Sequence, residues 1–297
     1  MLKLVISALT RMEDAYLKVW TPTQVQEGFG AQVTRLIGSM KPQLLDPFVL
    51  LDVFKATQPS GFPDHPHRGF EMLTYCLSGR IWCEDSLGTS QILQPGDVAC
   101  LSAGKGVLHA MVPATHTCEG IQIWVNVPSE RKLESPYFVS ARNEDLPILQ
   151  GEGWDMKVIC GRIGEETAPI QTKTPTSILD LEISPGASLN LPEFPGHSLC
   201  FHALTGAVTI ATTELKQGSA AELRSFPSSL PLFSLTGCRL LVLAGQPIRE
   251  DIVCQGPFVM TNRAELLRAA KDYTESANGF EASSTWRSQA ARQVCSL

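Results

Sequence analysis

Short apolar segments separated by glycine, proline, asparagine and aspartate recur along almost the whole chain. Runs of about four to eight residues rich in valine, isoleucine, leucine and aromatic side chains, bounded by turn residues, are typical of β-strands. So many short strands predict an all-β protein, built as a barrel or a sandwich. The clearest of these segments are FVLLDVF, MLTYCLSG, DVACLSAG, IQIWVNV, SILDLEI, LCFHALTGAVTIAT and RLLVLAG.

One segment near the C-terminus has a helical pattern instead. In ELLRAAKDYTESANGF, which begins at Glu265, the apolar residues from Leu266 to Tyr273 fall near a 3.6-residue spacing. Asn278 followed by Gly279 is a typical helix stop. At the other end, MLKLVISALTRM is too short an apolar stretch for a signal sequence and lacks a convincing cleavage site. We expect it to form the first strand.

The chain also repeats itself. YCLSGRIWCED and FHALTGAVTIAT both read as a strand, a turn glycine and a second strand, with Gly79 and Gly206 at equivalent turns. The long separation predicts two similar β-domains in tandem. Between them lies VPSERKLESPYFVSARNEDLPILQGEG, which is polar, contains proline and is the expected linker. We therefore expect an N-terminal domain over 1–148 and a C-terminal domain over 149–297.

Composition and charge exclude some classes of function. With 297 residues, the chain is long enough for two domains. A formal net charge of −6 gives no overall basic character, which argues against direct nucleic-acid binding. No apolar run approaches the roughly 18 residues needed for a membrane span, so no membrane role is expected.

The nine cysteines are odd in number and scattered singly, without a CxxC pair. This pattern disfavours a structural zinc site or a disulfide framework. Most of them lie in apolar runs, where a thiol behaves as a small buried hydrophobe. A reducing compartment follows, so we expect the cytoplasm, the nucleus or both.

Three histidines carry the most specific chemical signal. His65 and His67 stand two apart in FPDHPHRGFE, and His109 follows in AGKGVLHAM. Residues two apart on a strand point to the same face. A third imidazole from another strand could then close a metal site on three neutral nitrogens, which suit iron, zinc, copper or nickel.

The second repeat does not carry this signal. His65 and His67 precede Gly79 by 14 and 12 residues, and counting back equally from Gly206 gives Pro192 and Phe194. Neither residue binds a metal. The nearby His197 and His202 are five apart and face opposite ways on a strand, so we interpret them as ordinary structural or surface residues.

Taken together, the motifs resemble those of the pirin family of bicupins. They are EGFGAQVTRLIG, LLDPFVLLDVFK, GFPDHPHRGFEMLTYCLSG, EDSLGTSQILQPGDV, SAGKGVLHA, GIQIWVNVP, LAGQPIRE, GPFVM and NGFEASSTW, in this order over roughly residues 28–290. The resemblance implies two tandem cupin domains, each a jelly-roll β-barrel, with a short C-terminal helix. It also implies non-haem iron in the N-terminal domain and none in the C-terminal domain.

The resemblance carries the iron ligands to His65, His67 and His109, but not the fourth. Where the family usually has a glutamate two residues after the third histidine, this chain has Met111. A carboxylate is a hard, anionic ligand for Fe(II) or Fe(III), whereas a thioether is neutral and soft. Iron remains the expected metal, with zinc, copper, nickel or manganese as alternatives.

Three outcomes are open at the fourth position. A water could complete a three-histidine iron site, the metal affinity could be low, or Glu71 could act as a substitute ligand, because HPHRGFE also fits a general cupin pattern. Glu71 could instead pair with Arg68. Asp64 could accept a hydrogen bond from a ligand histidine or cap the turn after Pro63.

For function, the resemblance implies quercetin 2,3-dioxygenase-type activity on a flavonol-like substrate with O₂. Such chemistry needs a base, and with Met111 in place of glutamate only Glu71 could serve, so we expect a weakened iron-dependent oxygenase. The competing hypotheses are a redox-sensitive transcriptional co-regulator with a transcription-factor partner, and a metal-free interaction scaffold. The resemblance also implies a monomer.

Overall fold

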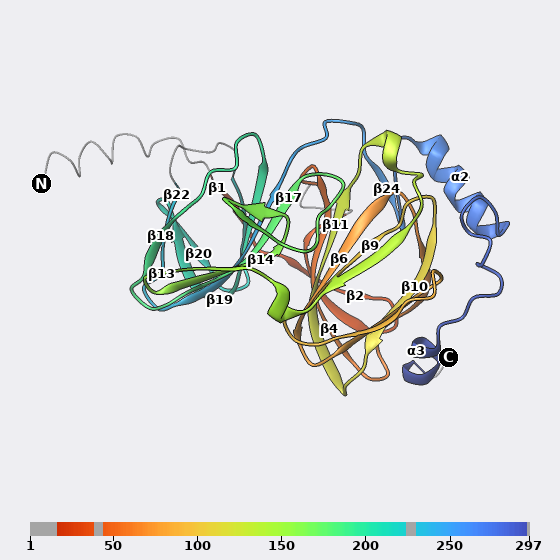
Figure 1. Ribbon diagram of the computed structural model, residues 1–297, viewed down its shortest axis with the longest axis horizontal. Helices are drawn as coiled ribbons and strands as arrows, with labels where there is room; N and C mark the ends of the chain where they lie inside the picture. The colour runs from red at the N-terminus through yellow and green to blue at the C-terminus, as the bar shows by residue number, and fades with distance from the viewer. Residues whose placement is uncertain (1–16, 39–43, 224–229, 296–297) are drawn as a thin grey trace, which may run out of the picture. The chain divides into compact units, whose positions relative to one another are not determined.

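The computed structural model describes residues 17–38, 44–223 and 230–295, and these form two compact units (Figure 1). One unit, here called the histidine unit, consists of Thr23–Asp145, Thr172–Thr174 and Ile248–Leu297. The other, here called the aliphatic unit, consists of Leu146–Gln171, Pro175–Pro247 and the segment that ends at Pro22. The all-β prediction is confirmed. The strand expected in MLKLVISALTRM lies outside the described residues.

The histidine unit contains two antiparallel sheets. The order of the larger is β12 (Tyr137–Ala141), β9 (Val98–Ser102), β6 (Phe70–Ser78), β11 (Thr117–Asn126), β4 (Phe48–Thr57), β3 (Ala31–Ile37), β2 (Thr23–Glu27). The order of the smaller is β5 (Phe62–His67), β10 (Val107–Pro113), β7 (Ile81–Asp85), β8 (Ser90–Leu93). Short 3₁₀ turns follow β11 and β12, at Ser129–Arg131 and Asn143–Asp145.

The C-terminal segment of the histidine unit adds a small hairpin and two helices. The hairpin is β24 (Val253–Gln255) and β25 (Phe258–Met260), and the helices are α2 (Arg263–Thr274) and α3 (Gln289–Val294). Asn262 caps α2 by accepting a hydrogen bond from the backbone N–H of Glu265. The expected helix is therefore present, although it ends before Asn278, and α3 was not anticipated. Neither helix is long and apolar enough to span a membrane, and the same holds throughout the described residues.

The aliphatic unit is also built from antiparallel strands. The main path is β1 (Leu17–Trp20), β21 (Ala220–Leu223), β19 (Ser198–Ile210), β23 (Cys238–Gly245), β17 (Thr176–Ile183), β14 (Trp154–Cys160), β13 (Ile148–Gly151). Three further strands extend it: β18 (Ser188–Leu191), β20 (Thr213–Lys216) and β22 (Leu230–Phe233). A separate two-stranded ribbon is made of β15 (Arg162–Ile163) and β16 (Glu166–Thr167).

Gly79 lies between β6 and β7, whereas Gly206 lies within the continuous strand β19 and not in a turn, yet the two glycines share one local geometry, which supports the repeat seen in the sequence. Gly79 and Gly206 have φ values of 66° and 68°. A Cβ atom at Gly79 would lie 2.2 Å from the carbonyl oxygen of Thr117, and one at Gly206 would lie 2.0 Å from that of Gly237. Any other residue would therefore be excluded twice, by its left-handed backbone and by the neighbouring strand.

The division into units differs from the expected domains, 1–148 and 149–297, at both ends of the chain. Near the N-terminus, β1 pairs with β21, so it adds a strand to the aliphatic unit. Near the C-terminus, the backbone N–H of Val259 donates to the carbonyl of Arg68, which joins the final segment to the histidine unit. Hydrogen bonds between strands distant in sequence thus set the boundaries, and the spacing of a linker does not reveal them.

Candidate metal centre

Two neighbouring strands position the three histidines. His65 and His67 lie at the end of β5, and His109 lies on β10 directly opposite His65 in the antiparallel register. Residues opposite each other on one face have their Cβ atoms about 5 Å apart, so the rings can meet. The rings do meet. Among the described residues, the three histidines form a group whose ligand atoms are close enough together to hold one metal ion. The convergence expected from the sequence is therefore observed.

The geometry of the ring nitrogens fits a metal ion. Nε2 of His109 lies 3.0 Å from Nε2 of His67 and 2.9 Å from Nε2 of His65. Nitrogens about 2.1 Å from one metal and at right angles to each other would be about 3.0 Å apart. Each of these two distances thus matches a pair of neighbouring ligands on one metal ion, and all three ligand atoms lie within 4.8 Å of one another.

The hydrogen bonds of two rings fix their tautomers. Nδ1 of His65 lies 2.7 Å from the carbonyl oxygen of Pro63, and Nδ1 of His67 lies 3.3 Å from that of Pro257. Because a carbonyl oxygen can only accept, each Nδ1 carries the proton and each Nε2 keeps a lone pair. Lone pairs that converge at this distance repel one another unless a cation lies between them.

Burial keeps these imidazoles in the form that binds metals. It lowers the pKa of His65, although the hydrogen bond to Pro63 opposes this effect. Burial, reinforced by the neighbouring His65, holds the pKa values of His67 and His109 well below their usual range. All three are therefore neutral near pH 7, as a metal ligand must be. The residues present fit a bound metal ion.

Met111 lies on β10, two residues beyond His109, and is buried. Its side chain packs in the apolar cluster that contains Phe54 and Ile81. The hydroxyl of Thr74 donates to its sulfur over 3.8 Å. The thioether thus fills apolar space where the family glutamate would place a charge.

Glu71 is not brought to the histidines. It lies on β6, where one carboxylate oxygen accepts from the hydroxyl of Tyr137 at 2.7 Å and the other from the backbone N–H of Lys173 at 2.6 Å. Burial raises the pKa of Glu71, and the bonds from Tyr137 and Lys173 oppose that rise. No carboxylate joins the three rings within the described residues. The role of Glu71 as a base or substitute ligand stays a prediction, and these contacts do not favour it.

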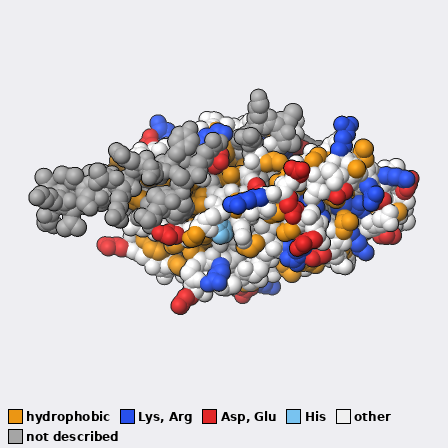
Figure 2. Space-filling view, turned by 90° about the horizontal axis from the view of Figure 1, so that it is seen from above, with side chains coloured by type: hydrophobic (Ala, Val, Ile, Leu, Met, Phe, Trp, Pro, Cys, Tyr) orange, Lys and Arg blue, Asp and Glu red, His pale blue; other side chains and the backbone are white. Residues whose placement is uncertain are grey.

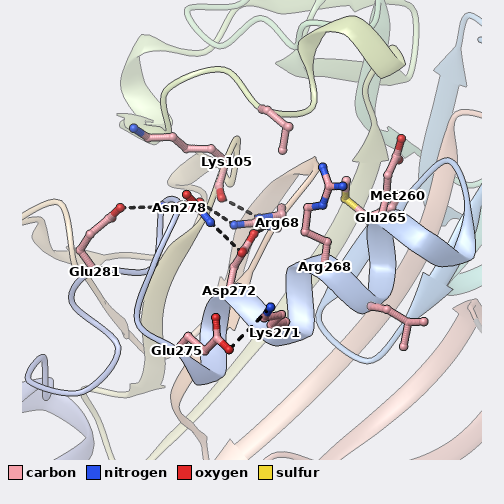
Figure 3. Close-up of a pocket in the computed structure, with 13 residues that line it drawn as sticks. Arg68, Lys105, Met260, Glu265, Arg268, Lys271, Asp272, Glu275, Asn278 and Glu281 are labelled. Atoms are coloured by element: carbon pink, nitrogen blue, oxygen red, sulfur yellow. Dashed lines mark hydrogen bonds and ion pairs between the residues drawn. The ribbon is translucent and has the colours of Figure 1, made fainter.

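Arg68 and Asp64 make contacts other than those expected from the sequence. Arg68 does not pair with Glu71: its guanidinium bonds Asp272 at 2.7 Å and the carbonyls of Lys105 and Asn278, as Figure 3 shows. Arg68 therefore ties α2 and the loop after it to the unit. Asp64 serves neither a ligand histidine nor a local turn, because it accepts from the backbone and hydroxyl of Ser288, the residue that caps α3.

Two of the three histidines, His65 and His67, open onto a cavity of about 500 Å³. This volume is in the range of small-molecule sites. His65 and His67 line it together with apolar, aromatic and polar side chains, among them Val49, Leu50, Phe62, Trp124, Gln122, Asp52, Arg35 and Glu27. The cavity is therefore mainly apolar, with a few polar groups at fixed positions.

A larger hollow of about 1020 Å³ lies along α2 (Figure 3), and no histidine lines it. Its charged groups are largely neutralised by each other, as in the pairs Arg68–Asp272 and Lys271–Glu275. Acidic and basic side chains are likewise interspersed over the face in Figure 2. We therefore place the candidate site at the histidines.

Sequence reasoning missed the polar pair in the cavity wall. Arg35 on β3 lies opposite Asp52 on β4, and its guanidinium makes two hydrogen bonds with that carboxylate, at 3.0 and 2.8 Å. Burial raises the pKa of Asp52 to about 6, although Arg35 opposes the shift. The only signal in the sequence was the presence of Arg35 and Asp52 within two otherwise largely apolar strands.

The fold and this site define a class: a bicupin with a three-histidine metal site in one of its cupin domains. The chain matches the family described as Pirin over residues 30–125, and the Pirin C-terminal cupin domain over residues 178–279. It therefore belongs to the pirin family, and the expected pair of cupin domains is confirmed.

Individual relatives agree over most of the chain. Pirin-like protein 2 of Arabidopsis thaliana is 36% identical over 281 residues, which cover 92% of this chain and 87% of the relative. Human Pirin is 35% identical over 277 residues, covering 89% and 93%. A crystal structure of quercetin 2,3-dioxygenase from Acinetobacter baumannii superposes with a TM-score of 0.81 at 30% identity, covering 87% and 96%.

Proposed function

We propose that this protein is an iron-dependent dioxygenase of the quercetin 2,3-dioxygenase type, acting on a flavonol-like substrate. The observation that carries the proposal is the convergence of three imidazole nitrogens beside a largely apolar cavity of about 500 Å³ that His65 and His67 line. The similarity to the quercetin 2,3-dioxygenase of Acinetobacter baumannii supports the choice of substrate. Nine free thiols, eight of them buried, fit a reducing compartment such as the cytoplasm or nucleus.

The three histidines would hold the metal through Nε2, with Nδ1 of His65 and His67 fixed by backbone carbonyls. A divalent iron held there would supply Lewis-acid and redox chemistry toward an enolic oxygen and O₂. Three neutral ligands would leave the full positive charge of such an ion in the site, and this charge would favour an anionic substrate.

The cavity walls suit a flat aromatic ring. Trp124 stacks on Phe70 with ring centroids 4.2 Å apart and meets the ring of His67 edge-on at 5.1 Å. Its buried indole N–H has no hydrogen-bond partner within the described residues. A buried donor without a partner is costly, so a substrate oxygen that accepts from Trp124 would be favoured.

A base for the substrate hydroxyl is available in Asp52. Asp52 lines the cavity, whereas Glu71 does not, and burial brings the pKa of Asp52 to about 6. A general base is most effective when its pKa is near the working pH. The partner Arg35 would hold the carboxylate in place while it accepts the proton.

Met111 sets the expected strength of this activity. Without a fourth, anionic ligand, the site would hold a metal less tightly than a site with three histidines and a glutamate. We therefore expect turnover to depend on the supply of iron, with activity falling when chelators compete.

The test is oxygen consumption by anaerobically iron-loaded protein mixed with quercetin, compared with a flavone that lacks the 3-hydroxyl group. The proposal expects uptake with quercetin only, and a raised KM in Trp124→Phe, which keeps the aromatic packing but removes the N–H donor. Protein that binds iron but consumes no oxygen with quercetin would contradict the proposed activity while leaving the metal site intact.

A further inference from the structure

The three ring nitrogens that face away from the metal position are not equally supported. For His65 and His67, Nδ1 donates to a backbone carbonyl. For His109, Nε2 points at the other two rings, and Nδ1 has no hydrogen-bond partner within the described residues. A metal-bound histidine almost always donates its other N–H to an acceptor, which fixes the ring and its tautomer. His109 therefore needs an acceptor.

Asp85 is placed to provide one. It is the last residue of β7 and pairs directly across from His109 on β10, so both side chains lie on the same face of the sheet. Its side chain is buried, with only 3% of the residue surface exposed. The turn after β7 and the strand β10 are held together by hydrogen bonds between Ser86 and Leu108, which keeps Asp85 beside His109.

The two oxygens of Asp85 have different surroundings. Oδ1 accepts from the backbone N–H groups of Leu87 at 2.8 Å and Thr89 at 3.1 Å, and thereby closes the turn between β7 and β8. Oδ2 is buried and has no hydrogen-bond partner. Among the described residues, it is the one buried carboxylate oxygen without such a partner. A buried acceptor left without a donor costs about 1–3 kcal/mol, so its persistence calls for an explanation.

Asp85 and His109 also line a common cavity. It is small: the space open to the centre of a water-sized sphere is about 10 Å³, roughly enough for one water molecule. The other carboxylate in its wall is Glu84, which already accepts from the backbone N–H of Ala290 at the start of α3. Asp85 Oδ2 is thus the anionic acceptor that remains on this side of the His109 ring.

We propose that Asp85 is the positioning residue of the metal site, and that its Oδ2 accepts the Nδ1 proton of His109 either directly or through one water molecule. The proposal rests on the proposed metal site. It gives all three histidines the same arrangement, with Nδ1–H on an oxygen acceptor and Nε2 toward the metal. It also returns a negative charge close to a ligand set that Met111 has left neutral.

The test compares nickel(II) and cobalt(II) binding by full-length wild type, Asp85→Asn and Asp97→Asn. Asparagine keeps the Oδ1 acceptor for the turn but replaces Oδ2 by a donor. Asp97 is the matched control, because it is a buried aspartate that bonds the backbone N–H groups of Gln94 and Asn143 in the same unit. Loss of such an outer partner typically weakens metal binding about 10–100-fold.

We expect a loss of this size for Asp85→Asn only, together with a changed visible spectrum of the bound cobalt(II), since the ligand field reports how His109 is held. Equal affinity and an identical spectrum in Asp85→Asn and wild type would overturn the proposal. So would an equal loss in Asp97→Asn, which would assign the effect to general destabilisation. If wild type bound neither metal, the proposed metal site itself would fail.

If Asp85→Asn does not fold, a measurement on the wild-type protein still tests the proposal. A crystal structure of the metal-loaded protein should place Asp85 Oδ2 within hydrogen-bond distance of His109 Nδ1, or one water molecule between them. An Nδ1 paired with any other acceptor would overturn the assignment.

Discussion

The two units share a left-handed glycine at matching places in the repeat, Gly79 between β6 and β7 and Gly206 within β19, yet their interiors differ. The aliphatic unit is filled by one large cluster of buried side chains, in which Phe194 occupies the place that His67 has in the repeat. The histidine unit also has buried apolar clusters, such as those around Phe54 and Phe70, but it keeps two cavities next to its histidines. One unit is packed for stability, and the other leaves room for a ligand.

Buried polar atoms without hydrogen-bond partners also distinguish the two units. Four buried side-chain polar atoms have no hydrogen-bond partner within the described residues, and all four belong to the histidine unit: those of Asp85, Ser102, Trp124 and Asn126. Such atoms reduce stability and are expected where a protein prepares a site. When a β-fold occurs twice in one chain, the copy that contains cavities and unpaired buried polar atoms is therefore the copy expected to bind a ligand.

The largest effect on stability should come from opening a cavity in the filled unit. Leu181→Ala removes a fully buried side chain from the core of the aliphatic unit. We expect it to lower the free energy of unfolding by about 3–5 kcal/mol, because the dense surroundings cannot close over the gap. Leu50→Ala, at the wall of the cavity, should cost only about 2 kcal/mol. Denaturant unfolding measures both, and equal losses would contradict the contrast.

The buried histidine of the aliphatic unit should make stability depend on pH. Burial lowers the pKa of His202 to about 4, although a bond to the carbonyl of Ser219 opposes the shift. The unfolded chain takes up a proton below about pH 6.5, which the folded chain resists. Stability is therefore lost as the pH falls from about 6.5 to about 4, by about 3 kcal/mol at most.

Replacement of this histidine isolates the effect. His202→Asn keeps a donor for Ser219 but no longer titrates. The difference in unfolding free energy between wild type and this variant should shift in favour of the variant on acidification. Parallel stability curves between pH 7 and pH 4 would show that His202 does not contribute in this way.

The smallest of the three effects concerns Met111. Met111→Glu buries a carboxylate among apolar residues, so the metal-free variant should lose about 1–3 kcal/mol of stability. With nickel(II) present, the new carboxylate can act as the fourth ligand beside His109, and affinity should rise roughly tenfold, which is about 1.4 kcal/mol. Thermal unfolding with and without metal measures both changes. Met111→Gln is the neutral control, and an equal gain in affinity there would rule out a role for the charge.

The parts of the site that follow from local rules could be predicted. The common face of His65 and His67 follows from the two-residue period of a strand, and the same rule places Met111 on the face of His109. The equivalence of Gly79 and Gly206 came from the repeat. These inferences need only a few neighbouring residues, and the structure agrees with them.

Contacts between distant segments could not be predicted. The partner of Arg68 is Asp272, 204 residues away, and Asp64 is held by Ser288, 224 residues away. Glu71 is bound by Tyr137 and Lys173, 66 and 102 residues away. Short-range patterns favoured neighbours in each case, because the charges of Arg68 and Glu71 are close in sequence. The strand register and the C-terminal helices decided otherwise.

The central claim is that the three converging histidines hold a metal ion. It is tested most directly by elemental mass spectrometry on protein purified without chelators and loaded anaerobically with Fe(II), for wild type, His67→Ala and His116→Ala. His116 is an exposed histidine of the same unit and serves as the control. We expect about one metal ion per chain in wild type and in His116→Ala, and none in His67→Ala. Full occupancy in His67→Ala, or an empty site in wild type after loading, would contradict the claim.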